Sequence, residues 1–408
     1  MKKTYVLTIL FFSLLVCCKG IKEIEIVKTI EFNTGFVEVY WRFKGIYYDK
    51  DYKQEVIYFS DLGQSAECLF PKKIGKSCIK MFNLQGKLLD TIPLINVVNE
   101  FNPRKIAFIY PYSKDTIFCG KHTENKIVVI NHKGDIYHTI NMDTMLPDSL
   151  ENLYSINQRN NPYQERNSSK ILLHPMLNYR ESLLKENKSD FNLMDGYELY
   201  YKTVHNSPYF FELKNIFSDK INYDFKYYDF YKKHFSIEDV AMSKNSYFKE
   251  LNNFIFILAN SKNLILKIDP ENFELLNEIS IKSKHTDIGY SFTFEEKFND
   301  AENKKSLYTG RICELFYNEK TEQYFVIVMH SAKNEEEYDS YNEFDFRPFS
   351  VIIYNENFEN PKEYSFEAHR YICRNAFMSQ EGLWMQRKPE KMTKENYGTQ
   401  IFDLIKFN

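Results

Sequence analysis

Apolar and polar positions along the chain recur in a short strand-turn-strand unit. Residues 79–94 (IKMFNLQGKLLDTIPL) align without gaps to residues 127–142 (IVVINHKGDIYHTINM), 48 positions later. In both copies an apolar run ends at an asparagine, a glycine follows three positions on, and a second strand-like run begins. Asparagine opens tight bends, and glycine takes positive φ without steric strain. The pattern therefore predicts an antiparallel hairpin in each copy.

Two more copies of this unit occur, at 265–281 and 351–366, with different turn sequences. Ile127 and Ile265 are 138 residues apart, which is three steps of 46, and hairpins repeated at 40 to 50 residues are typical of β-propeller blades. An apolar strand precedes three of the hairpins, at 116–119, 254–258 and 324–329. A further strand comes before each of these, and we expect it on the outer side, at 105–110, 237–242 and 311–317. Four strands per unit match a propeller blade.

This template predicts an all-β fold, a six-bladed β-propeller with four-stranded antiparallel blades. The expected blades are approximately 36–95, 101–143, 147–232, 236–282, 307–367 and 370–408. The last range contains three clear strands, and the alternating segment 23–31 (EIEIVKTIE) is expected to supply its fourth, which would close the ring and leave no exposed sheet edge. The alternative is a split β-sandwich or a two-domain all-β protein with similar hairpins.

Composition supports strands and excludes several classes of protein. Aromatic residues make up 17% of the 408 residues, against only 13 Gly and 12 Pro, and aromatic side chains favour pleated sheets. With 43% hydrophobic and 27% charged residues, the chain is neither disordered nor a polytopic membrane protein. The formal charge of −3 provides no basic field for phosphate backbones, so nucleic acid is not an expected partner.

The N-terminus has the layout of a secretory signal: Lys2 and Lys3, an apolar run over 5–16, then Cys17 and Cys18. Twelve residues of helix span about 18 Å, too short to cross a bilayer. The run 15–18 (LVCC) resembles a bacterial lipobox, with a cysteine where Gly or Ala is commoner. We expect a signal peptide over 1–17, lipidation of Cys18 and a single propeller domain over 18–408. The alternative is an ordinary secreted protein.

Such a protein would be lipid-anchored in the cell envelope of a Gram-negative-type bacterium, at the outer membrane, with the periplasmic or surface side left open. Among its five later cysteines, Cys119, Cys313 and Cys373 lie in apolar runs typical of buried strands. Cys68 and Cys78 are close enough in sequence to form a disulfide, and the sequence leaves that pairing open.

Three insertions interrupt the repeat, at 147–187, 197–231 and 331–346. The second is rich in Tyr and Phe, which fits either core strands or a sugar-stacking surface. The third mixes carboxylates with aromatic residues, and it lacks the ligand spacing of an EF-hand. Loops on a rigid scaffold commonly carry binding function. We therefore expect a partner-binding loop here, with the candidate residues Tyr338, Asp339, Tyr341, Glu343 and Phe344.

Motifs for common chemistry are missing from the sequence. The run Gly75-Lys76-Ser77 resembles the end of a phosphate-binding loop, but such a loop needs glycine five positions earlier, where this sequence has Phe70. Neither G-x-G-x-x-G nor G-x-S-x-G occurs. His122, His132 and His138 lack the spacing of a zinc-binding helix. We expect no cofactor, no metal and no catalytic residue from motifs alone, although residues from separate blades can meet in a central channel.

Together these features resemble the domain of unknown function 4221 family of bacterial lipoproteins. The residues that carry the resemblance are the lipobox, the hairpin 126–142, the strand 208–213 with its aromatic continuation, and the block 308–317 (YTGRICELFY). The resemblance implies a six-bladed propeller lipoprotein over most of 20–408. That family has no assigned reaction or substrate, so it implies no functional residue.

Three functional hypotheses follow. The first is a non-enzymatic, lipid-anchored envelope propeller that binds a protein or glycan partner through loops on one face. The alternative is a hydrolase or lyase directed at carbohydrate or lactone-like material, with acid and base carboxylates from different blades meeting in the central channel. Converging carboxylates, histidines or a metal in the channel would favour the enzyme. A structural subunit of an envelope complex is a third possibility.

Overall fold

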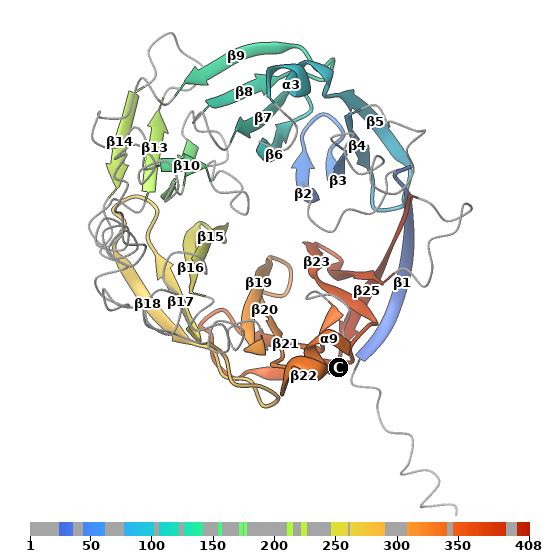
Figure 1. Cartoon of the computed structure of the whole chain (residues 1–408), viewed down its shortest axis with the longest axis vertical. Coiled ribbons are helices and arrows are strands. Elements are labelled where there is room, and N and C mark those ends of the chain that lie inside the picture. Colours follow the sequence, from blue (N-terminus) through green and yellow to red (C-terminus); the bar gives the residue numbers. More distant parts are fainter. Residues whose placement is uncertain are drawn as a thin grey trace, which may run out of the picture.

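The strands are arranged in a ring around a central axis (Figure 1). The computed structural model describes residues 24–35, 44–61, 77–101, 106–121, 126–141, 154–156, 171–173, 175–177, 210–214, 222–226, 246–259, 262–289, 308–340, 346–388 and 398–408. The predicted leader 1–17 and Cys18 lie outside these ranges. Within them, no helix has the length and apolar character needed to span a bilayer.

Among the residues that the structure describes, five sheets have four antiparallel strands each, which confirms an all-β propeller with four-stranded blades. The first blade contains β2 (Lys44–Asp49), β3 (Gln54–Asp61), β4 (Cys78–Phe82) and β5 (Leu88–Pro93). The second contains β6 (Ile106–Ser113), β7 (Thr116–Lys121), β8 (Lys126–Ile130) and β9 (Ile136–Asn141). Another blade contains β15 (Ser246–Leu251), β16 (Phe254–Ala259), β17 (Leu264–Ile268) and β18 (Leu275–Ser280). The blade that follows it contains β19 (Arg311–Asn318), β20 (Gln323–Met329), β21 (Phe349–Tyr354) and β22 (Lys362–Phe366).

The fifth four-stranded sheet, which we call the terminal blade, joins the two ends of the chain. It contains β23 (Tyr371–Ser379), β24 (Gly382–Arg387), β25 (Thr399–Phe407) and β1 (Ile24–Asn33). β1 runs antiparallel to β25 from the Ile24–Phe407 pair to the Asn33–Thr399 pair. This is the pairing that the sequence predicted for 23–31. That the pairing is what holds the ring closed stays a prediction.

The prediction of six four-stranded blades is wrong in its count. The described strands of the expected blade 147–232 form a three-stranded sheet and a separate two-stranded sheet, in the arc between β9 and β18 (Figure 1). The three-stranded sheet contains β11 (Ile171–Leu173), β13 (Phe210–Lys214) and β14 (Asn222–Lys226), and the two-stranded sheet contains β10 (Tyr154–Ile156) and β12 (Pro175–Leu177). Three of the five are three residues long. Polar insertions interrupt the apolar runs here, and so short a strand forms few ladder hydrogen bonds.

The direction of the chain within each blade also differs from the prediction. The strands expected on the outer side at 105–110 and 311–317 correspond to β6 and β19, which lie nearest the central axis (Figure 1). The predicted strand 237–242 lies outside the described residues, and the inner strand of that blade, β15, begins at Ser246. Sheet order runs from β6 outward to β9 and from β19 outward to β22. Periodicity identifies neighbouring strands, but it contains no information about which end of a sheet faces the axis.

All four predicted hairpins are present, and their turns share one hydrogen-bonding pattern. In each, a side-chain oxygen at the start of the turn accepts two backbone N–H groups from within it; these side chains are Asn83, Asn131, Asp269 and Asn355. Gly86 and Gly134 have φ of 77° and 79°, as the sequence predicted. Phe273 and Phe358 take the corresponding conformation, with φ of 61° and 59°.

Apolar side chains fill the spaces between adjacent blades. Phe32 of β1 lies among Phe59 and Phe82 of the first blade and Phe402 of the terminal blade, with ring centroids 5.4, 5.5 and 5.7 Å from its own. The predicted burial of Cys119, Cys313 and Cys373 is confirmed. Cys78 is also buried, whereas Cys68 lies outside the described residues, so whether the two cysteines pair stays open.

Candidate functional site

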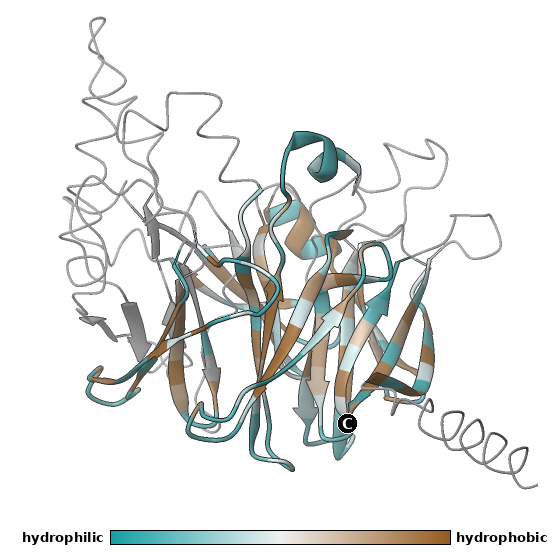
Figure 2. Cartoon of the chain, turned by 90° about the horizontal axis from the view of Figure 1, so that it is seen from below, coloured by the Kyte–Doolittle hydropathy of each residue, from teal (hydrophilic) through white to brown (hydrophobic). Residues whose placement is uncertain are grey.

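The two edges of the ring differ in the connections they carry. The tight hairpin turns lie on one edge, and the opposite edge, which we call the loop face, carries the connection from β20 to β21 with helix α9 (Glu335–Ser340) (Figure 2). Helix α3 (Ile95–Glu100), in the connection from β5 to β6, is on the same face. Loops of this kind can diverge without disturbing the blades that support them.

The predicted binding loop lies on this face, and the structure describes part of it. Tyr338 and Asp339 belong to α9, whereas Tyr341, Glu343 and Phe344 lie outside the described residues. None of the residues of α9 is buried, so the helix does not contribute to the core. Tyr338 is half-buried against Tyr308, with ring centroids 5.3 Å apart.

Local hydrogen bonds fix the start of α9. The Asn334 side chain accepts the backbone N–H of Glu337 at 2.8 Å, and the Glu337 carboxylate accepts the N–H of Lys333 at 2.6 Å. These reciprocal bonds satisfy backbone donors that the first helical turn would leave without partners. The helix is therefore held in place although it is outside the core.

Arg347 lies beneath α9 and is fully buried. Its Nη2 donates to the carbonyl oxygens of Tyr308, at 2.8 Å, Thr309, at 3.3 Å, and His330. The Cζ atom of Arg347 lies 6.0 Å from the ring centroid of Tyr338. A guanidinium can donate several bonds in one plane, so this one side chain joins the segment before β19, the end of β20 and the start of β21. Sequence reasoning missed Arg347, because one arginine at the end of an acidic loop gives no signal of burial.

Next to Arg347 is a chain of polar side chains. His330 is buried, and its Nε2 lies 2.7 Å from the hydroxyl of Ser350. Glu363 accepts the Ser283 hydroxyl at 2.6 Å and the Lys284 amide at 2.7 Å, and it also bonds Ser350. The polar chain thus crosses from the blade of β19–β22 to the connection that precedes it.

Burial, hydrogen bonds and neighbouring charges determine the protonation states of His330 and Glu363. Burial, together with the neighbouring charge of His285, lowers the pKa of His330 to about 4. The rings of the two histidines are stacked, with centroids 5.4 Å apart. Burial alone would raise the pKa of Glu363, but its hydrogen bonds outweigh that effect and the pKa lies below its ordinary value. At neutral pH the site therefore holds a neutral imidazole beside a carboxylate.

A second contact joins the connection after β18 to the loop that carries α9. The hydroxyl oxygen of Thr286 accepts the backbone N–H of Ser331 at 2.8 Å, and it lies 3.0 Å from the Ser331 hydroxyl. Ser331 begins the loop that carries α9. The loop is therefore attached at its base on both sides, by Thr286 and by Arg347.

The loop face continues toward the terminal blade with a basic, aromatic section. His369 has a positive φ of 65°, and its N–H donates to the carbonyl oxygen of Phe346 at 2.9 Å. Its Nδ1 lies 3.0 Å from Lys388 Nζ, which is 4.3 Å from the Phe346 ring centroid. Burial and the Lys388 charge lower the pKa of His369, so a neutral imidazole accepts from the lysine. A non-glycine residue in this backbone conformation is strained, and such strain is often found at functional positions.

The innermost strands carry a different chemistry. Lys249 of β15 pairs with Glu314 of β19, and Lys249 lies 4.5 Å from the ring centroid of Phe316. The Glu314 carboxylate therefore forms an ion pair with the ammonium group of Lys249 from the adjacent blade. Across the ranges that the structure covers, no three His, Cys, Asp or Glu side chains gather closely enough to hold a metal ion.

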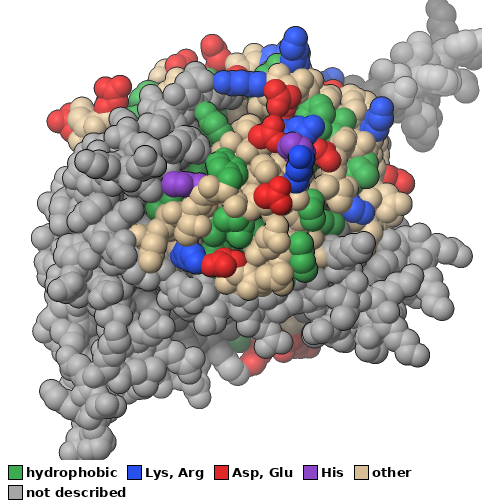
Figure 3. Space-filling model, turned by 90° about the horizontal axis from the view of Figure 1, so that it is seen from above, with side chains coloured by type: hydrophobic (Ala, Val, Ile, Leu, Met, Phe, Trp, Pro, Cys, Tyr) green, Lys and Arg blue, Asp and Glu red, His purple; other side chains and the backbone are tan. Residues whose placement is uncertain are grey.

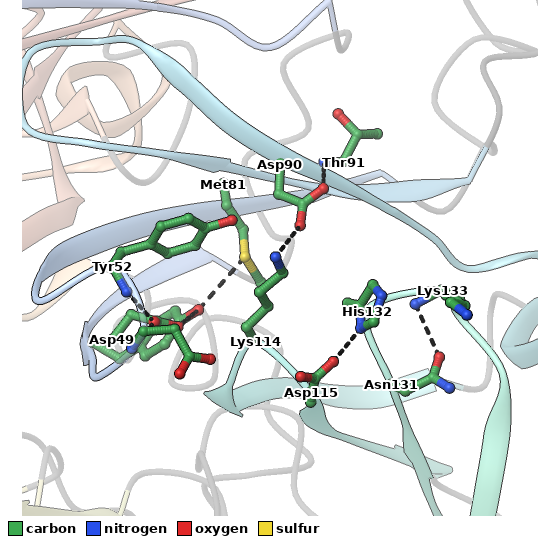
Figure 4. A network of polar contacts seen from close by, with 12 residues as sticks. Asp49, Tyr52, Met81, Asp90, Thr91, Lys114, Asp115, Asn131, His132 and Lys133 are labelled. Atoms are coloured by element: carbon green, nitrogen blue, oxygen red, sulfur yellow. Dashed lines mark hydrogen bonds and ion pairs between the residues drawn. The ribbon is translucent and has the colours of Figure 1, made fainter.

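The outer surface around the second blade mixes all side-chain types. Cationic, anionic and apolar side chains alternate between the regions that are not described (Figure 3). His132 pairs with Asp115 here, and Lys114 lies 3.7 Å from Asp90 of the first blade (Figure 4). His138 is in β9 rather than in this turn, and His122 lies outside the described residues. Exposed ion pairs such as these contribute little to stability and do not form a site.

Comparison with known proteins supports the fold. No family model and no curated protein sequence matches the chain. A solved member of the domain of unknown function 4221 family from Bacteroides vulgatus is similar over 95% of this chain and 99% of its own, at 15% identity and a TM-score of 0.64. A protein of Bacteroides fragilis described as exported matches over 95% and 96%, at 10% identity and a TM-score of 0.49. The predicted likeness to the 4221 family is thus confirmed in the fold.

Proposed function

We propose that this protein is a lipid-anchored envelope propeller that binds a protein or glycan partner through its loop face. The observation that carries the proposal is the attachment of α9. A helix with no buried residue is nevertheless fixed by Arg347, by the contact of Tyr338 with Tyr308 and by its own N-terminal hydrogen bonds. Ordering each residue of such a loop costs about 1 to 2 kcal/mol of backbone entropy, so stability of the ring gives no reason to keep it.

The chemistry of the face suits a polar partner. Exposed carboxylates of α9 include Glu335 and Asp339, and the cations Arg370 and Lys388 lie next to β23 and β24. Half-buried aromatic rings such as Tyr338 supply area for contact at small entropic cost. The leader and Cys18 of the sequence support export and lipid anchoring as part of the same proposal.

A photo-crosslinking residue at Glu336 in the native envelope tests the binding role. The matched control places the same residue at Tyr137, which is half-exposed on outer strand β9. We expect a defined crosslinked partner from position 336 that is missing from position 137. Replacing residues 333–345 by a Gly-Asn turn should abolish capture of that partner in a pull-down and leave the thermal midpoint of the blades unchanged. Identical products from both positions would refute the assignment of the loop face.

A further inference from the structure

The first strand of the ring begins on the side of the molecule opposite α9. Ile24 pairs with Phe407 beside the C-terminus, which lies at the lower edge in Figure 2, whereas α9 lies at the upper edge. β1 is also the outermost strand of its sheet. The point at which the described chain starts is therefore a lower, outer corner of the terminal blade.

The distance from this corner to the proposed anchor is short. Six residue steps separate Cys18 from Ile24, and an extended chain covers at most about 3.6 Å per step, or roughly 22 Å in all. If Cys18 carries acyl chains, as the proposed function holds, the start of β1 cannot move farther than this from the membrane surface. The rest of the ring is free to tilt around that point.

A β-bulge at the same corner exposes two apolar side chains in a row. The register between β1 and β25 shifts between Ile26 and Lys28, so Val27 has no partner residue. Neighbouring residues of a regular strand point to opposite faces, but here Ile26 and Val27 are 38% and 55% exposed. We call these two residues the bulge patch. The other large apolar residues that are exposed in the described chain stand singly.

Charged side chains surround the bulge patch in pairs. Lys28 lies 3.1 Å from Glu381, and Lys406 lies 3.9 Å from Glu25. The paired charges leave little net electrostatic field, so what distinguishes this corner is its apolar surface. Exposed apolar side chains beside an acyl anchor are suited to the boundary between lipid headgroups and acyl chains.

We propose that the bulge patch is the membrane-contacting surface of this protein, and that a bilayer surface is its occupant. The inference rests on the lipid anchoring of the proposed function. It orients the molecule: the corner formed by β1 and β25 meets the membrane, and the loop face with α9 and Arg347 points away from it. The partner would then reach the loop face from the aqueous side.

Fluorescence quenching on the intact lipoprotein tests the orientation. The protein is placed in phosphatidylethanolamine–phosphatidylglycerol vesicles that contain lipids with a nitroxide near the headgroup. An environment-sensitive fluorophore is attached at Val27→Cys and, as matched controls, at Tyr137→Cys and Glu336→Cys; labelled protein without these substitutions gives the background from native thiols. We expect quenching at position 27 to exceed that at either control about two-fold or more.

Equal quenching at positions 27 and 137 would overturn the inference, and the bulge would then only protect a sheet edge from pairing. Stronger quenching at position 336 would overturn it as well, by placing the loop face on the membrane. If the protein does not incorporate palmitate and does not sediment with vesicles, the anchor and the inference both fail. Partner binding is measured separately, on a Cys18→Ser chain in solution, so the two failures can be told apart.

Discussion

Thr29 donates a hydrogen bond of 2.7 Å to Asp403, across 374 residues of sequence. Asp403 is fully buried, and it also accepts Tyr371 at 2.8 Å and Arg387 at 2.6 Å. The four side chains come from β1, β25, β23 and β24, so one carboxylate connects every strand of the terminal blade. A buried carboxylate is stable only with such partners, because removal from water is costly for a charge.

Asp403→Ala should therefore destabilise the protein by about 3 kcal/mol or more, since it leaves Arg387 and Tyr371 without their buried acceptor. The free energy of unfolding from a urea titration measures the effect. Glu381→Gln is the matched control, because it removes the exposed pair with Lys28 in the same blade and should cost less than about 1 kcal/mol. Similar losses in both variants would show that the network has no special role.

Deleting residues 19–32 should open the ring, because β25 would lose its outer partner and expose a sheet edge. We expect a lower thermal midpoint and concentration-dependent association in sedimentation velocity. A truncated chain that stays monomeric and keeps its midpoint would contradict ring closure by β1. Loss of residues 19–22 alone, outside the paired strand, serves as the control.

Gly134→Ala should cost far more than Gly35→Ala, although both glycines have positive φ. A Cβ on Gly134 would lie 2.1 Å from the carbonyl oxygen of Pro93 in the adjacent blade, whereas one on Gly35 would meet only the flexible end of Lys80 at 3.3 Å. The conformational penalty of about 1 kcal/mol is common to both variants, so their difference isolates contact between blades. If chemical denaturation gave the same loss of unfolding free energy for both variants, the blades could separate at this contact at no cost.

Stability should fall as the pH drops from about 6.5 to about 4, because His330 takes up a proton far less readily in the folded protein than in the unfolded chain. The unfolded state therefore binds more protons in this window, and the loss amounts to at most about 3 kcal/mol. His330→Gln should remove this part of the pH dependence. Exposed His132→Gln is the control, and an unchanged pH profile in His330→Gln would exclude the assignment.

Arg347→Lys should loosen the α9 loop while the blades stay folded, since the tetrahedral ammonium of lysine does not reproduce the planar guanidinium whose Nη2 lies against three carbonyl oxygens. We expect faster hydrogen exchange over residues 331–340 and a loss of about 1 to 3 kcal/mol in unfolding free energy. Arg370→Lys, at an exposed position nearby, should leave both unchanged. Exchange that does not differ between the two variants would show that Arg347 does not hold the loop.

Local patterns predicted the hairpins and the pairing of β1, because they depend on turn residues and on alternation within a few positions. Asn83 and Gly86 define their turn without reference to the rest of the chain. The direction of each sheet and the number of complete blades were not predictable in this way. Both depend on how blades pack around an axis, and the short strands of 147–232 follow from interruptions whose effect on pairing is not local.

Of the candidate site, the sequence located the loop but not its support. Tyr338 and Asp339 were identified from the mixture of acidic and aromatic residues in one insertion. Arg347, His330 and Glu363 belong to separate segments and meet only in the folded protein, so no spacing reveals them. Phe358 shows the same limit: it takes the turn position of Gly86, and its ring stacks on Tyr324, with centroids 4.2 Å apart, instead of leaving room for a neighbouring backbone.

The pairing of β1 with β25 also determines when the protein can finish folding. A ribosome makes β1 first and β25 last, and 366 residues separate Asn33 from Thr399. At synthesis rates of about 5 to 20 residues per second, β1 waits for roughly 20 to 70 seconds before its partner exists. Blades made of consecutive strands need only neighbouring segments of the chain, but the terminal blade needs both of its ends. The terminal blade is therefore the last that can be completed, and until then the edge of β25 has no partner strand.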